Sequence, residues 1–219
     1  HIDPKLVGNK QRVLVSDLSG KSNISFKANE LNIKYKDSKE ITSKLVSKVK
    51  DLEFEGYQFE AADASLELIL RELSGEYSPF FKVLDSKVHI SYDESGTEKA
   101  DATLKVLVGD DIEHTASDGD GPVDALNNAL RKALAMFFPE LKDVRLTDYK
   151  VRVLNEQEGT GAKVRVLIES AYEDDSWSTI GVSKNIIEAS RQALSDSFNY
   201  RLAKLSQWSI KNKKSLQLS

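Results

Sequence analysis

The chain has 219 residues, of which 40% are hydrophobic and 30% are charged, so it can bury a core and is not disordered throughout. The absence of cysteine excludes a disulfide framework and any thiolate metal site. A net charge of −4 is not that of a phosphate-backbone binder, and no apolar run approaches the roughly 18 residues of a membrane span. We therefore expect a cytoplasmic protein without a nucleic-acid or membrane partner.

The beginning of the chain carries neither a start methionine nor a signal peptide. It opens with HIDP, and the single methionine is Met136. We interpret the sequence as a piece of a longer protein, so that part of its function belongs to a parent.

Residues 1 to about 79 are predicted to form a small helical region. A short helix is expected from Ser22 to Asn32, and the segment DASLELILREL predicts another helix that begins near Asp63. Between them a clearer helix follows Ser38 and ends at Gly56. Its apolar residues recur at spacings of four, four and three, which is one helical stripe: Ile41, Leu45, Val49 and Leu52.

Beyond residue 79 the hydrophobic period changes from about 3.6 to 2. The segments KVHISY and ADATLKVLV alternate apolar with polar residues and predict antiparallel strands that are wet on one face, with DESGTE as their turn. DIEHTAS predicts a third strand, and an amphipathic helix over residues 122–138 closes the unit.

The same order of elements then recurs. DYKVRV, AKVRVLI and SWSTIGV predict three strands, and a helix begins at Ile186. ATLKVLV aligns with AKVRVLI, and GPVDALNNAL aligns with NIIEASRQAL at an offset of 64 residues. The predicted fold class is α+β: a small helical region, then a duplicated βββα domain with two antiparallel sheets and helices on one face. The copies span about 82–140 and 146–204, and residues 207–219 are expected to form a flexible tail.

Few residues are candidates for catalysis or metal binding. The three histidines are His1, His89 and His114, and none has the spacing of a metal-ligand pair. His89 and His114 are interpreted as surface residues of strands, and the carboxylates are scattered without an acid–base pair. The sequence therefore predicts no catalytic residue and no metal ligand in this chain.

The segment TASDGDGPVDA, at residues 115–125, is the best candidate for a binding site. Pro122 suits the first position of a helix, Gly121 suits the N-cap, and Gly119 is expected to allow a positive φ, which together describe a well-made helix start. Alternatively, free backbone N–H groups and the helix dipole face a carboxylate or phosphate. Asp118 and Asp120 then favour a small zwitterion over a polyanion.

Several stretches together resemble the C-terminal half of the citramalate, isopropylmalate and homocitrate synthase family. They are KLVGNKQRVLVSDLSGKSNI, EGYQFEAADASLELILRE, GDGPVDALNNALRKAL, DYKVRVL, GTGAKVRVLIES and TIGVSKNIIEAS, within residues 1 to about 203. VLVSDLSGKSN and GYQFEAADAS are closer to the citramalate type. Isopropylmalate synthases typically carry histidine in an HSGR motif where this chain has Leu18 in LSGK, which weakens the isopropylmalate alternative.

The resemblance implies a parent with an N-terminal (β/α)₈ barrel, an acyltransferase that condenses acetyl-CoA with pyruvate and uses a divalent metal, in isoleucine biosynthesis. Without that barrel the chain would need no cofactor and would be inactive. Residues 1–79 would be helical linker subdomains. Residues 80–206 would be the regulatory domain, which forms a homodimer and binds the end-product isoleucine at the dimer interface.

Carried over residue by residue, the resemblance gives an effector site made of Gly119, Asp120, Gly121, Pro122, Val123, Asp124, Tyr149, Gly161 and Ala162. Two alternatives stay open. One is the regulatory part of a 2-isopropylmalate synthase, which would bind leucine. The other is a purely structural dimerisation module, in which the glycine loop is only a helix start.

Overall fold

A computed structural model gives the structure of the chain and describes residues 27, 30 and 39–216. The helix expected between Ser22 and Asn32 and the departure at Leu18 therefore lie almost entirely outside the described residues. The first elements that the structure describes continuously are α2 (Lys39–Glu55), the short 3₁₀ helix η2 (Phe59–Ala61) and α3 (Asp63–Leu73).

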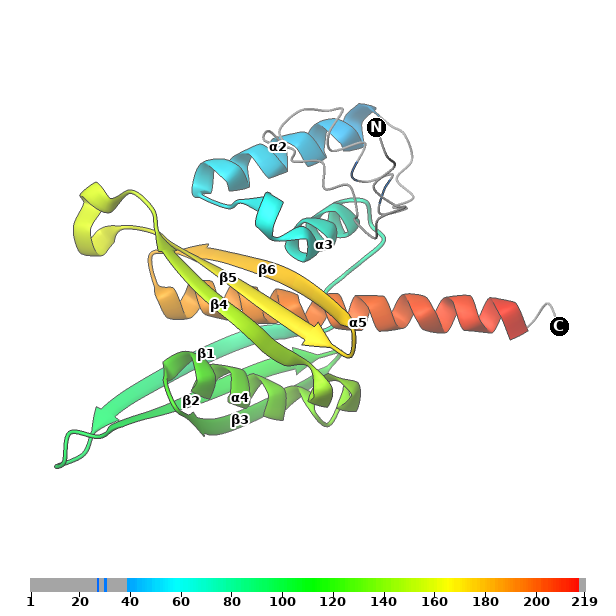
Figure 1. Cartoon of the computed structure of the whole chain (residues 1–219). Coiled ribbons are helices and arrows are strands. Elements are labelled where there is room, and N and C mark those ends of the chain that lie inside the picture. Colours follow the sequence, from blue (N-terminus) through cyan, green and yellow to red (C-terminus); the bar gives the residue numbers. More distant parts are fainter. Residues whose placement is uncertain (1–26, 28–29, 31–38, 217–219) are drawn as a thin grey trace, which may run out of the picture.

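Two three-stranded antiparallel sheets follow, each with its strands in sequential order and each succeeded by a helix (Figure 1). The predicted α+β class, with a helical part first and a duplicated βββα unit, is confirmed. The elements of the two units are β1 (Lys82–Tyr92), β2 (Glu98–Val108), β3 (Asp111–Gly119), α4 (Pro122–Leu134), β4 (Arg145–Val153), β5 (Val164–Tyr172), β6 (Asp175–Ser183) and α5 (Ile186–Leu216).

Two buried threonines reveal how the copies correspond. The hydroxyl of Thr115 in β3 donates to the carbonyl of Ala129 at 2.9 Å, and that of Thr179 in β6 donates to the carbonyl of Ala193 at 2.8 Å. Both pairs are related by an offset of 64 residues. Each threonine is also opposite a buried residue of the central strand, Leu104 for Thr115 and Ile168 for Thr179. These strands therefore share the offset of the helices.

The alignment of ATLKVLV with AKVRVLI is consequently wrong by four residues. Ala102 corresponds to Val166, which lies four residues beyond the aligned Ala162. Side chains alternate with a period of two along a strand, so any even shift gives an equally good match of apolar residues. Only the register with the neighbouring strand removes the ambiguity.

The two copies pack through their helices and share one hydrophobic core. Helix α4 packs on β2 and β3, helix α5 packs on β5 and β6, and the two helices contact each other. In Figure 1, α4 lies in front of the first sheet and α5 lies behind the second. The guanidinium of Arg131 in α4 lies 5.0 Å from the ring centroid of Phe198 in α5, which adds a polar tie between the copies.

The helical region packs on the outer face of the second sheet. Leu167 and Ile180 are opposite each other in the β5–β6 pair and contact the apolar faces of α2 and α3. The second sheet therefore has helices on both of its faces. The outer face of the first sheet is exposed and mostly polar, as the alternating sequence predicts, although it also carries Ile112.

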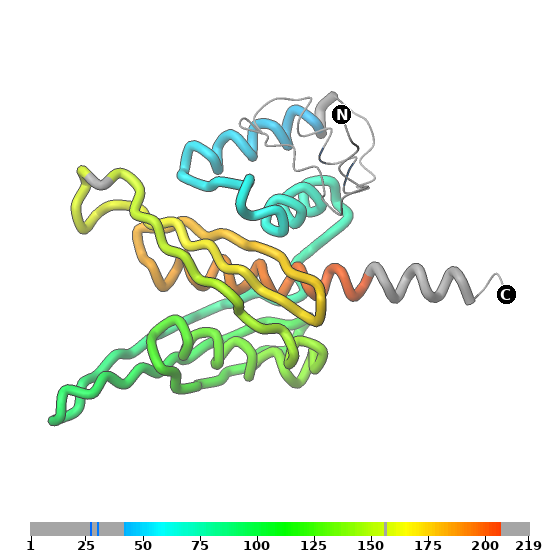
Figure 2. The backbone as a smooth tube through the Cα atoms, in the orientation of Figure 1, coloured from blue at the N-terminus to red at the C-terminus, as the bar shows by residue number. Residues whose placement is uncertain are grey.

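Helix α4 ends at Leu134, four residues before the predicted end. Phe138 precedes Pro139 and has φ −136° and ψ 70° as the N-cap of the 3₁₀ helix η3 (Pro139–Asp143), because a residue before proline is disfavoured in the α conformation. Figure 2 shows the β1–β2 hairpin projecting from the body. Helix α5 continues to Leu216, and the domain boundaries and tail flexibility stay predictions.

Candidate functional site

The glycine loop joins the end of β3 to the start of α4. Gly119 does not have a positive φ, so that expectation was wrong. Its role is close packing, because a Cβ there would lie 2.2 Å from the backbone nitrogen of Ala125. Gly121 is the N-cap in an extended conformation, and Pro122 is the first helical residue, as predicted.

Asp124 completes the helix start. Its Oδ2 accepts a hydrogen bond from the backbone N–H of Asp120 at 3.1 Å and another from Nδ2 of Asn128 at 3.2 Å. Nδ2 of Asn128 also donates to the carbonyl of Asp118 at 3.2 Å. A carboxylate in the first turn also favours the helix dipole. The loop therefore has a full structural explanation, which keeps the helix-start alternative open beside an effector role.

The remaining predicted site residues belong to the second copy. The hydroxyl of Tyr149 in β4 lies 2.9 Å from Oγ of Ser190 in α5. Gly161 ends the 3₁₀ helix η4 (Glu156–Gly161), and Ala162 follows it and is buried. Among the described residues, no hydrogen bond joins the glycine loop to Tyr149 or Ala162. Val123 is half-buried and packs on the shared core.

Each copy leaves part of the helix-side face of its first strand uncovered. Ile90 and Tyr92 of β1 are 44% and 67% exposed, and Tyr149, Val151 and Val153 of β4 are 36%, 42% and 46% exposed. Ala100 is buried opposite Ile90, and Val166 is buried opposite Val151, so both sets share the face of the core. The alternation predicted these strands, but not that α4 and α5 would leave them bare.

A polar seam joins the helical region to the second copy. Oγ of Ser65 in α3 donates to Oδ2 of Asp196 in α5 at 2.7 Å and accepts from the backbone N–H of Ile180 in β6 at 3.1 Å. The hydroxyl of Tyr57 donates to Oε1 of Gln192 at 3.3 Å. This seam holds α3, α5 and β6 together and was not anticipated from the sequence.

Burial perturbs the ionisable groups of this seam. It raises the pKa of the Asp196 carboxyl to about 7, helped by the charge of Glu72 and opposed by the Ser65 hydrogen bond and Arg191. Burial and the nearby Asp196 raise the pKa of Tyr57 to about 12. Burial is also the first cause of the raised pKa of Tyr77, followed by the charge of Asp196. Asp196 is therefore the one carboxyl in this seam that titrates near neutrality.

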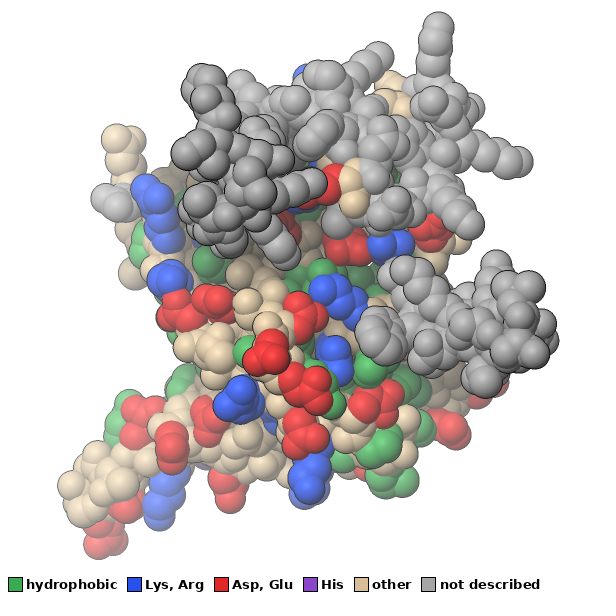
Figure 3. Space-filling model, turned by 45° about the vertical axis from the view of Figure 1, so that its right-hand side comes forward, with side chains coloured by type: hydrophobic (Ala, Val, Ile, Leu, Met, Phe, Trp, Pro, Cys, Tyr) green, Lys and Arg blue, Asp and Glu red, His purple; other side chains and the backbone are tan. Residues whose placement is uncertain are grey.

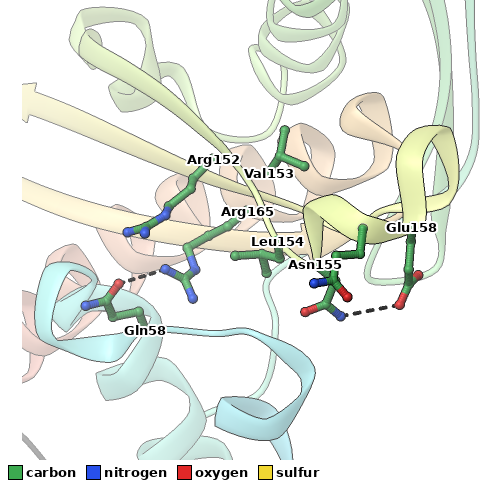
Figure 4. A pocket seen from close by; sticks show the side chains of 8 residues that line it. Gln58, Arg152, Val153, Leu154, Asn155, Glu158 and Arg165 are labelled. Carbon is green, nitrogen blue, oxygen red and sulfur yellow. Dashed lines mark hydrogen bonds between the residues drawn. The ribbon is translucent and has the colours of Figure 1, made fainter.

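A pocket of about 840 Å³ opens between the helical region and the β4–β5 hairpin (Figure 4). Nε of Arg165 donates to the carbonyl of Gly56 at 2.6 Å, and its Nη1 donates to Oε1 of Gln58 at 2.7 Å. Arg152 lies beside Arg165 and points the same way. The pocket is lined by Gln58, Arg152, Val153, Leu154, Asn155, Gln157, Glu158 and Arg165.

The rest of the described surface carries scattered ionisable side chains. In the part of the chain that the structure describes, no group of three or more histidine, aspartate or glutamate side chains is placed to hold a metal ion. His89 and His114 are exposed, as predicted. Figure 3 shows acidic and basic side chains interspersed on the visible face. None of the described helices has the length and apolar character needed to cross a membrane.

These features define an α+β module of two βββα units with bare apolar strand faces and a glycine loop. The chain belongs to the family of the LeuA allosteric (dimerisation) domain, whose model matches residues 60–202. It is 51% identical to an (R)-citramalate synthase of Geobacter sulfurreducens and 48% identical to one of Aquifex aeolicus, over 93% of this chain in both cases. It is 31% identical to a 2-isopropylmalate synthase of Shewanella woodyi over 58% of this chain and 22% of that protein.

The chain spans 39% of the length of each of the two citramalate synthases. Membership of the LeuA allosteric (dimerisation) domain family agrees with the regulatory domain that the resemblance implied. The greater identity and coverage with the citramalate synthases agree with the likeness of GYQFEAADAS and VLVSDLSGKSN to that type.

Proposed function

We propose that this chain is the linker and regulatory part of an (R)-citramalate synthase, that it forms a homodimer, and that it binds isoleucine at the dimer interface as a feedback inhibitor. The catalytic barrel of the parent would bind acetyl-CoA, pyruvate and the divalent metal. This chain would be inactive alone. The relatives named above and the family of the domain support the proposal.

The bare apolar faces of β1 and β4 carry the proposal for a dimer. They lie on the core side of their sheets, so they continue the hydrophobic core instead of forming isolated surface residues. Exposed apolar patches of this kind mark interaction sites in soluble proteins. A second copy that places its own strands against them would complete the layer that α4 and α5 leave open.

The effector site is proposed where the glycine loop and Tyr149 border this interface. The start of α4 presents the positive end of its dipole to a carboxylate, and the carboxylates of Asp120 and Asp124 suit an ammonium group. The hydroxyl of Tyr149, which is hydrogen-bonded with Oγ of Ser190, is a further polar anchor at the edge of an apolar face. This combination suits a branched-chain amino acid.

Inhibition requires that the effector prefer one arrangement of the protein over another, because a ligand with equal affinity for both states shifts nothing. The helical region is fastened to the second copy through Ser65 and Arg165. A change at the dimer interface would therefore be carried to the helical region as a rigid unit, and from there to the barrel of the parent.

The test combines calorimetry with a mass measurement in solution. We expect isoleucine to bind the chain and leucine and valine to bind more weakly. Valine lacks one methylene, which is worth about 10-fold to 200-fold, and leucine is an isomer that carries its methyl branch one carbon further along. Tyr149→Phe and Asp124→Asn should weaken the binding of isoleucine. Absence of heat with all three amino acids rejects the effector site, and stronger binding of leucine would favour the isopropylmalate synthase alternative.

The dimer has its own matched pair of variants on β4. Val151→Glu places a charge on the bare face and is expected to give monomers by light scattering. Lys150→Glu, on the opposite face of the same strand, should leave the dimer intact. A dimer that binds no amino acid would support the structural module, which the self-contained hydrogen bonds of Asp124 favour.

A further inference from the structure

The pocket beside the helical region contains two arginines that are direct neighbours across strands. Arg152 in β4 is opposite Arg165 in β5, so their side chains leave the sheet on the same face. This is the outer face, opposite to that of Val151 and Tyr149, because successive side chains of a strand alternate. The pair therefore faces away from Tyr149, although Gly161 of the proposed effector site ends the η4 segment that supplies Glu158 to this pocket. A ligand bound to the two arginines does not require the effector site.

The first copy has a different pair at the equivalent position. An offset of 64 residues relates Arg165 to Asp101, and Asp101 is opposite His89 in the β1–β2 pair. Nδ1 of His89 lies 3.2 Å from Oδ1 of Asp101, which is a mutually satisfying contact. The duplicated fold therefore accepts a complementary pair at this position, and the second copy has two like charges instead.

Two like charges directly opposite each other destabilise a sheet. Burial and then the charge of Arg152 lower the pKa of Arg165, which shows that the guanidinium is desolvated and feels its neighbour. Among the residues that the structure describes, no carboxylate forms an ion pair with either arginine. Glu158 lines the pocket but forms no ion pair with them, so among the described side chains no ion pair neutralises the two charges.

The geometry of the pocket is prepared for a ligand with negative charge. Two hydrogen bonds to Gly56 and Gln58 fix the guanidinium of Arg165, while its Nη2 is free of any recorded hydrogen bond within the described part. Figure 4 shows the side chains of Arg152 and Arg165 directed toward the helical region, with Asn155 further along the same pocket. Planar guanidinium groups match the oxygens of carboxylates and phosphates.

We propose that Arg152 and Arg165 bind a small dianion, of the phosphate or dicarboxylate class, in this pocket. The dianion supplies the counter-charge that no ion pair of the described residues supplies. Because Arg165 also holds Gly56 and Gln58, the occupied pocket fastens the helical region more firmly to the second sheet. Glu158 lines the same pocket, and its carboxylate accepts from Nδ2 of Asn155 at 3.5 Å, so it opposes the binding of an anion.

Calorimetry on the whole chain tests the proposal with inorganic phosphate, pyrophosphate and succinate as separate titrants at constant ionic strength. Chloride in equal concentration is the control for general screening. We expect at least one dianion to bind and chloride to give no saturable heat. The ranking of phosphate against succinate distinguishes the two ligand classes. If chloride competes equally with every dianion, the proposal is rejected.

Variants decide whether the pocket is the site. Arg152→Ala, at an exposed position of an edge strand, should lower the affinity for the dianion about tenfold or more, as the loss of one charge-assisted contact predicts. Arg145→Ala, an exposed arginine on the same strand outside the pocket, should leave affinity unchanged. Glu158→Gln should tighten binding. Unchanged affinity in Arg152→Ala, or equal loss in Arg145→Ala, overturns the proposal.

A second measurement separates binding from folding. The melting temperature of the chain should rise with dianion concentration and should do so less in Arg152→Ala, because a ligand that binds only the folded state stabilises it. Circular dichroism of each variant without ligand establishes that it is folded. An equal rise in melting temperature in Arg152→Ala and in the unsubstituted chain contradicts the assignment of the pocket.

Discussion

Substitution of Asp196 by asparagine probes the polar seam between α3 and α5. Asparagine has the same shape, and its Oδ1 can still accept the hydrogen bond that Ser65 donates at 2.7 Å. The substitution removes only the ability to ionise. Any difference between Asp196→Asn and the parent chain that varies with pH therefore reports the charge on this carboxyl.

The sign follows from the raised pKa. Burial moves the pKa of Asp196 from 3.8 to about 7, so the folded state holds the proton more tightly than the unfolded chain. The stabilisation of the folded state by the protonated Asp196 carboxyl is fully present below about pH 4 and is lost as the pH rises toward about 7. Each pKa unit corresponds to about 1.4 kcal/mol, and the side chain keeps an intermediate exposure that screens part of the penalty. We expect a loss on the order of 2–4 kcal/mol across this range.

Urea unfolding of both proteins between pH 4.5 and 8 is the assay. Asp196→Asn should be slightly more stable near the acidic end, and its advantage should grow to the order of 2–4 kcal/mol above pH 7. Asp111→Asn, at an exposed position of β3, is the matched control and should follow the parent chain. An advantage of Asp196→Asn that does not change with pH would refute the reasoning.

Four further substitutions test the packing of the duplicated domain. Thr115→Val and Thr179→Val should each cost about 1 kcal/mol of unfolding free energy and should add in the double variant to within about 0.5 kcal/mol, because equivalent hydroxyls are lost at separate sites. Arg131→Met removes donors to the carbonyls of Leu141 and Val144 and should cost on the order of 2–4 kcal/mol, measured by urea unfolding. Gly119→Ala should lower the melting temperature, since overpacking against α4 costs about 1–3 kcal/mol or more.

The architecture was predictable because each element has its own period. The stripe through Leu45, Val49 and Leu52 gave a helix, and alternation in KVHISY gave a strand, without any knowledge of tertiary contacts. The glycine loop was likewise placed correctly at the start of α4, through Pro122 and Gly121. Local signals of this kind survive folding because backbone conformation and capping depend on neighbouring residues.

The contacts between elements were not predictable in the same way. Alternation in a strand identifies its apolar face but not the helix that covers it, so the sequence could not show that Val151, on the apolar face of β4, is exposed. The burial of Asp196 had no signal in the sequence, because nothing in the sequence indicates that α3 packs beside it. Arg152 and Arg165 became a pair only through the register of β4 with β5.

The duplication makes these differences informative. At equivalent positions the copies keep what the fold needs, as the two buried threonines with their carbonyl partners show. They differ where each copy meets something outside itself. The second copy carries the helical region on its outer face and has the arginine pair there. The outer face of the first copy is exposed and has His89 with Asp101. A pair required only for folding would be expected to suit both copies equally, so the departure at Arg152 and Arg165 is best explained by the contact that the second copy alone makes.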